Sequence, residues 1–136
     1  MAEQKKGSSA FTDAERAIMK ERAREAREFK KLSGEEQVSR KIAEMSPSEK
    51  KMAKAIHSLV MGISPDITTK TWYGMPAYTL DGKVMLFLSV SSKWDTRYST
   101  LSFEDKANLD DGEMWPTGFA IKSWNQKVAT RVQELI

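Results

Sequence analysis

The chain has 136 residues, a formal net charge of +3, one histidine and no cysteine. This length suits one domain. The lack of cysteine excludes disulfides, thiol catalysis and thiolate metal sites, and the single histidine excludes two-histidine metal sites. No apolar run approaches the ~18 residues of a membrane helix. The charged start at residues 1–6 is not typical of a signal peptide. We therefore expect a cytoplasmic protein, since a cysteine-free chain suits a reducing compartment.

The first third of the chain is predicted to be a tail and a charged helical extension. Residues 1–11 combine glycine, serine and lysine with almost nothing to bury, so we expect a disordered tail. Thr12 and Glu15 have the spacing of a capping box, which predicts a helix within residues 12–34. Its apolar positions are mostly alanine, and oppositely charged side chains recur at three- and four-residue spacing. This composition predicts a helix that needs little tertiary packing.

Residues 35–136 are predicted to form the folded domain. We expect helices at 35–45 and from Pro47 to about Gly62, the second opened by a capping box at Ser46 and Glu49. From residue 68 the apolar period changes to two, which predicts strands at 68–73, 75–80, 83–91, 96–103 and 118–121. A short helix is expected at 104–109, and Ser123 and Gln126 are expected to cap a last helix. The predicted fold class is α+β, a single antiparallel sheet of about four to five strands flanked by helices.

The Asp81-Gly82 pair predicts a two-residue hairpin turn, and that turn fixes an expected register. Leu80 then faces Lys83, and Tyr78 faces Met85. One face of the hairpin then carries small side chains on one strand and branched side chains on the other, as packing against helices requires. Its residues are Ala77, Thr79, Val84, Leu86, Leu88 and Val90. The opposite face carries Pro76, Tyr78, Leu80, Lys83, Met85, Phe87, Ser89 and Ser91. This face is too apolar to be fully exposed to water and too polar to be fully buried in a core. We expect it to be half-covered by the last helix or to be the working surface.

Aromatic residues concentrate in the second half of the chain, and such side chains suit either a core or a ligand pocket. The predicted binding residues for a small molecule or a protein partner are Trp72, Tyr73, Pro76, Tyr78, Lys83, Met85, Phe87, Trp94, Arg97, Tyr98 and Trp115. Most of the excess of positive over negative charge lies in the N-terminal helix and its tail, where acidic residues are interleaved, so we do not expect nucleic-acid binding. We expect a monomer or a weak homodimer.

No catalytic constellation is evident. His57 is one step from the apolar stripe of its helix, which favours a boundary histidine, hydrogen-bonded or exposed, over a catalytic base. No phosphate-binding glycine loop is present, and we expect no cofactor. Asp110, Asp111 and Glu113 could offer oxygen ligands to a cation, but Asp-Asp-Gly is also ordinary turn chemistry. They are the alternative metal site.

Several ordered segments resemble the YdhG-like family of uncharacterised bacterial proteins. They are TWYGMPAY (71–78), LDGKV (80–84), RYSTLSF (97–103), NLDDG (108–112) and MWPTGFAI (114–121). The resemblance covers about residues 37–136. It implies an α+β domain and little about activity, since the family has no agreed catalytic residues to carry over, and family members are sometimes labelled frataxin-like intracellular iron chaperones.

The sequence predicts a non-enzymatic binding domain with an aromatic-rimmed sheet face. The alternatives are an iron or metal chaperone and a small enzyme that uses a carboxylate as acid or base.

Overall fold

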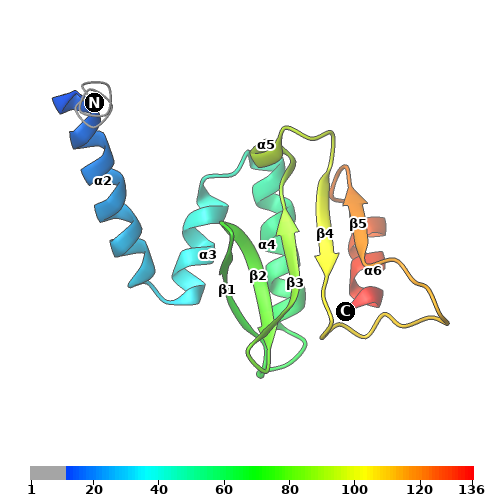
Figure 1. Cartoon of the computed structure of the whole chain (residues 1–136). Coiled ribbons are helices and arrows are strands. Elements are labelled where there is room, and N and C mark those ends of the chain that lie inside the picture. Colours follow the sequence, from blue (N-terminus) through cyan, green and yellow to red (C-terminus); the bar gives the residue numbers. More distant parts are fainter. Residues whose placement is uncertain (1–11) are drawn as a thin grey trace, which may run out of the picture. The chain divides into compact units, whose positions relative to one another are not determined.

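The computed structural model describes residues 12–136 and is shown in Figure 1. It divides into two compact units, one ending at Leu32 and the other running from Ser33 to Ile136. The tail predicted for residues 1–11 lies outside the described residues. Within residues 12–136, no helix is long and apolar enough to cross a membrane.

The first unit contains helix α2, Asp13–Lys30. The predicted capping box is present: the Thr12 hydroxyl accepts from the Glu15 amide, and the Glu15 carboxylate accepts from the Thr12 amide. Arg24 pairs along the helix with Glu21 and Glu28. No residue of α2 is buried, so local capping and surface ion pairs account for this helix.

Helices α3, Gly34–Ala43, and α4, Pro47–Met61, open the second unit. Each begins with a capping box, Ser33 with Glu36 and Ser46 with Glu49. Apolar residues at three- and four-residue spacing give each helix a buried stripe. The buried apolar residues of the two helices are Val38, Ile42, Met52, Ala53, Ile56 and Val60.

The remaining chain forms one five-stranded antiparallel sheet in the order β1-β2-β3-β4-β5. Its strands are β1 Thr68–Trp72, β2 Met75–Leu80, β3 Lys83–Ser89, β4 Ser99–Phe103 and β5 Gly118–Ile121. Helix α5, Ser91–Trp94, lies between β3 and β4, and helix α6, Gln126–Leu135, ends the fold. The predicted α+β class, with a single antiparallel sheet and flanking helices, is confirmed.

Two local predictions about helices are wrong. Residues 104–109 form no helix, and the short helix lies instead at α5. The reason is a long-range contact, because the Glu49 carboxylate accepts hydrogen bonds from Ser91 and Ser92 at the start of α5. The cap of α6 is Asn125, whose side chain accepts from the Val128 amide at 2.9 Å, rather than Ser123.

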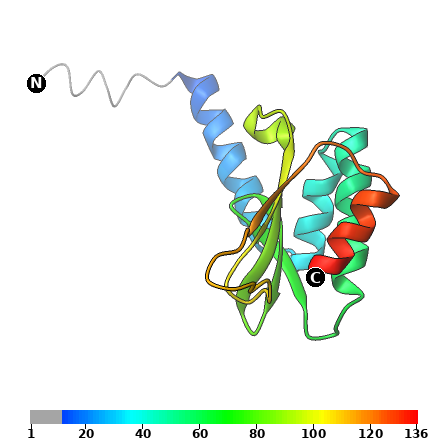
Figure 2. The same ribbon diagram turned by 90° about the vertical axis from the view of Figure 1, so that its right-hand side faces the viewer.

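Helices α3, α4 and α6 lie on the same face of the sheet, as Figure 2 shows. The apolar core fills the space between these two layers. Its strand residues include Tyr78, Met85, Leu86, Leu88, Leu101, Phe103 and Ile121. No helix of residues 33–136 covers the opposite face of the sheet, which we call the open face.

The predicted hairpin register holds only next to the turn. Leu80 pairs with Lys83 and Thr79 with Val84, but a β-bulge then shifts the register, so that Tyr78 pairs with Leu86 rather than with Met85. Met85 is the extra residue, and both Met85 and Leu86 are buried in the core. The prediction that Tyr78 and Met85 lie on the face opposite Leu86 is therefore wrong. Ala77 pairs with Phe87 and lies on the open face with it.

Candidate functional site

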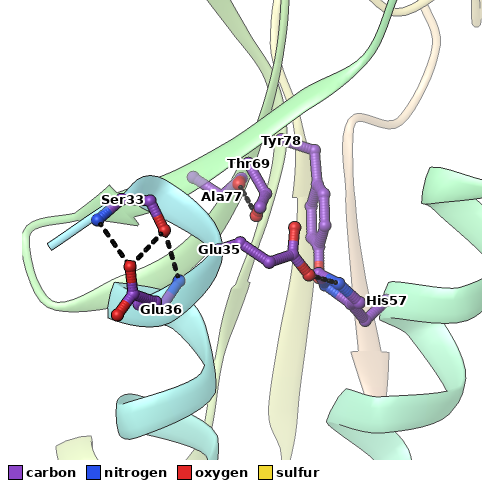
Figure 3. Close-up of polar contacts among 7 residues, drawn as sticks. All are labelled: Ser33, Glu35, Glu36, His57, Thr69, Ala77 and Tyr78. Atoms are coloured by element: carbon purple, nitrogen blue, oxygen red, sulfur yellow. Dashed lines mark hydrogen bonds and ion pairs between the residues drawn. The ribbon is translucent and has the colours of Figure 1, made fainter. Parts of the chain in front are cut away.

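Three polar side chains from three elements meet beside the core. The Tyr78 hydroxyl, from β2, lies 2.9 Å from His57 Nδ1, on α4. His57 Nε2 lies 2.6 Å from Glu35 Oε1, on α3. Figure 3 shows the Tyr78 ring reaching from the sheet to His57, while Glu35 approaches from the first turn of α3. We call this set the Glu35–His57–Tyr78 chain; it ties α3, α4 and β2 together.

Donor and acceptor rules assign the protons of this chain for an ionised Glu35 and a neutral His57. An ionised Glu35 can only accept, so His57 Nε2 carries a proton and donates it. Nδ1 of a neutral imidazole is then an acceptor, and the Tyr78 hydroxyl donates to it. Burial, with a smaller contribution from the charge of Glu35, raises the pKa of Tyr78 above its ordinary value. Tyr78 is only 1% exposed, so its phenol stays a neutral donor.

The start of α3 fixes the position of Glu35. The capping box of Ser33 and Glu36, drawn in Figure 3, begins the helix immediately before it. Gly34 packs directly on β1, because a Cβ atom at this position would lie 1.9 Å from the carbonyl oxygen of Thr69. Only glycine permits so close an approach of the helix to the strand. Thr69 is itself held to β2 by its hydroxyl, which donates to the Ala77 carbonyl at 2.9 Å.

A pocket of about 430 Å³ lies between α3 and α4, and we call it the α3–α4 pocket. Its apolar lining comes from α3, through Val38, Ile42 and Ala43. The polar lining consists of Glu35, Ser39, Lys50, Lys54, His57 and Ser58. Two lysines and one glutamate therefore line this pocket, together with one histidine and two serines. Such a mixture of an apolar wall and convergent polar groups is typical of a small-molecule site.

The structure brings together some of the predicted binding residues. The Trp72 ring lies 5.0 Å from Phe87 and 5.1 Å from Tyr73, measured between centroids. Trp72 and Phe87 lie on the open face, and Tyr73 is 78% exposed in the turn that joins β1 to β2. These three aromatic rings form one cluster. Tyr78 and Met85 do not belong to it, since both are buried under the helices.

The other predicted binding residues lie elsewhere. Pro76 is buried on β2, and Lys83 is exposed at the far end of the β2–β3 hairpin. Trp94 is on α5, and Arg97 lies over the Tyr98 ring at 5.5 Å in the segment that follows. Trp115 lines a separate cavity of about 460 Å³ after β4. The proposed set of eleven residues is thus not one surface.

The alternative metal residues Asp110, Asp111 and Glu113 are all exposed. Within the described part of the chain, no three histidine, aspartate or glutamate side chains are grouped so that they could hold a metal ion. The pocket of Trp115 contains Asp110 but neither Asp111 nor Glu113.

Sequence reasoning missed the α3–α4 pocket, although one signal for it was present. Lys50, Lys54, His57 and Ser58 recur at three- and four-residue spacing, which places them on one side of α4 beside the buried stripe. The reading of His57 as a boundary histidine agrees with its two hydrogen bonds. Its partner Glu35 lies 22 positions away, and no local pattern indicates that pairing.

Comparison of the chain with protein-family models, curated proteins and solved structures finds no match. The resemblance to the YdhG-like family stays a prediction.

Proposed function

We propose that residues 33–136 form a non-enzymatic binding domain whose ligand is a small phosphate-bearing molecule held in the α3–α4 pocket. The observation that supports this proposal is that Lys50 and Lys54 both line a pocket with an apolar wall. The proposal places the domain in the cytoplasm, since the chain has no cysteine.

The charges of the pocket favour an anion. Lys50 and Lys54 outnumber the one carboxylate of the lining, Glu35. Lysine binds phosphate as a point charge, and charge-assisted hydrogen bonds are stronger than neutral ones. Ser39 and Ser58 add hydroxyl donors for further phosphate oxygens. The apolar wall on α3 would receive the body of the ligand.

The Glu35–His57–Tyr78 chain supports binding more than catalysis. His57 Nδ1 is paired with the Tyr78 hydroxyl, which is buried, and Nε2 is paired with Glu35, so a substrate would have to displace one of these partners to exchange a proton with the imidazole. Its contribution is to hold α3 at a fixed distance from α4 and β2. The second candidate, an enzyme that uses a carboxylate as acid or base, has one supporting observation. The Glu35 side chain is 60% exposed at the pocket, although it also binds His57.

A matched pair of ligands tests the proposal. Calorimetric titration of the full chain with glucose 6-phosphate should give saturable binding, and glucose should bind at least roughly tenfold more weakly, because it lacks the charged group. The double variant Lys50→Gln with Lys54→Gln should bind glucose 6-phosphate more weakly than the wild type by a similar factor. Lys51→Gln is the control, since Lys51 is exposed on the same helix and does not line this pocket.

Two results would contradict the proposal. One is equal affinity for glucose and glucose 6-phosphate. The other is an equal loss of affinity in Lys51→Gln and in the double variant, because a general charge effect would then replace a site.

A further inference from the structure

A second pocket lies on the other side of α3, where the C-terminal part of that helix meets the β1–β2 turn and α5. Its volume is about 270 Å³. Five apolar side chains line it, namely Met45, Met75, Pro76, Leu88 and Val90. The remaining lining residues are Lys41, Glu44, Gly74, Ser92 and Lys93. We call this the Lys93 pocket. It shares no lining residue with the α3–α4 pocket.

The Lys93 ammonium is held in place by the turn beneath it. Lys93 Nζ donates to the Tyr73 carbonyl at 2.7 Å and lies 5.3 Å from the Trp94 ring centroid. Gly74 has a φ of +76°, and a Cβ atom there would lie 2.6 Å from Lys93 Nζ. Glycine is thus favoured at this position both by the left-handed backbone and by the space that the lysine occupies.

A buried carboxylate fixes α5, from which Lys93 projects. Glu49 accepts from the Ser91 hydroxyl at 3.0 Å, and from the Ser92 amide and hydroxyl at 3.0 and 2.7 Å. Burial alone would raise the pKa of Glu49, but the hydrogen bonds from Ser92, Ser91 and Ser46 outweigh it and lower the pKa. Glu49 therefore stays ionised and keeps the segment before Lys93 in one conformation.

Positive charge exceeds negative charge in this pocket. Partial desolvation, and then the charge of Lys41, lower the pKa of Lys93. Glu44 lies 3.8 Å from Lys41 Nζ and is the one carboxylate of the lining. An anion between the two lysines would relieve their repulsion. Lys93 is exposed, so a ligand can reach it from solvent.

We propose that the Lys93 pocket binds a small carboxylic acid with an aliphatic body. The carboxylate would take hydrogen bonds from the Lys41 and Lys93 ammonium groups, and the chain would lie on the apolar lining. Burial of the methylene groups of such a chain is favourable, so the apolar contribution to binding adds to the ionic one. This chemistry differs from that of the α3–α4 pocket, whose polar lining favours phosphate, and the two proposals can fail separately.

Methionine methyl groups give a local readout of this site. Two of the eight methionines, Met45 and Met75, line the pocket, while Met114 is 89% exposed in a loop outside it. The full chain labelled with ¹³C at methionine methyls should be titrated with sodium hexanoate. Saturable shifts are expected at Met45 and Met75 and none at Met114. Hexanamide, which has the same chain without the charge, should bind at least roughly tenfold more weakly.

Charge variants complete the test. Lys93→Gln and Lys41→Gln should each weaken hexanoate binding by roughly tenfold. Glu44→Gln should strengthen binding, because it removes the opposing charge. Lys83→Gln is the control, since Lys83 is exposed at the far end of the hairpin. The proposal is overturned if hexanoate causes no saturable shift at Met45 and Met75, if hexanamide binds equally well, or if Lys83→Gln loses as much affinity as Lys93→Gln.

Discussion

Replacing Tyr78 with phenylalanine removes one oxygen atom from the Glu35–His57–Tyr78 chain and leaves the buried ring in place. The lost hydroxyl lies 2.9 Å from His57 Nδ1, and no other partner is described for that nitrogen within residues 12–136. Leaving a buried acceptor unpaired costs about 1–3 kcal/mol. The His57 side chain is 21% exposed, so water can recover part of this cost. We therefore expect Tyr78→Phe to lower the free energy of unfolding by about 1–2 kcal/mol.

The assay is a urea melt of the wild type and of Tyr78→Phe at pH 7 and again above pH 10. The folded state raises the pKa of Tyr78 above 10.0, so its neutral phenol is favoured. The stability that the neutral Tyr78 phenol adds to the folded state is complete below the ordinary pKa of a phenol and declines as the pH rises above that value. Tyr78→Phe lacks the ionisable group and should not show this part of the alkaline loss. A loss of under about 0.3 kcal/mol at pH 7, with identical alkaline behaviour in both proteins, would refute the reasoning.

Three further outcomes are expected. Glu49→Gln should cost about 1–3 kcal/mol at pH 7, because the amide cannot accept from all the Ser91 and Ser92 donors. The folded state lowers the pKa of Glu49, so the stability that its carboxylate adds is present above the ordinary pKa of 4.5 and is lost as the pH falls through the lowered pKa. Urea melts from pH 7 to 3 in which both proteins lose stability in parallel would contradict this expectation. Residues 33–136 alone should melt cooperatively, because the buried core lies within them, and a broad, non-cooperative thermal transition would contradict this. Asp110→Asn with Asp111→Asn should leave a calorimetric titration with ferrous iron unchanged, whereas loss of a saturable site would favour the metal-chaperone alternative.

Local patterns were enough to predict most of the fold. The capping boxes at Thr12 and Ser46 and the Asp81-Gly82 turn each involve residues within a few positions of one another, and all are present. The β-bulge was not predictable in this way. A turn fixes only the cross-strand residue pairs next to it. The β-bulge at Met85 is favoured because it lets both Met85 and Leu86 enter the core, with Leu86 paired to Tyr78. Packing across the sheet decides this register.

The candidate site depends on contacts between distant positions. Glu35 meets His57 across 22 positions, and His57 meets Tyr78 across 21. Neither spacing has a local signature. The error in the hairpin register also moved Tyr78 to the wrong face and so separated it from the helices. The contact of Trp72 with Tyr73 could be anticipated because the two residues are neighbours in the chain, whereas Phe87 lies on β3, which β2 separates from β1.

Phosphate binding in the α3–α4 pocket is tested most directly by a map of backbone amide shifts in the full chain as glucose 6-phosphate is added. We expect saturable shifts concentrated in α3 and α4 around Glu35, Lys50, Lys54 and His57, which are among the residues that line the α3–α4 pocket. Saturable shifts confined to the Trp72 cluster on the open face, or no saturable shift at all, would contradict it.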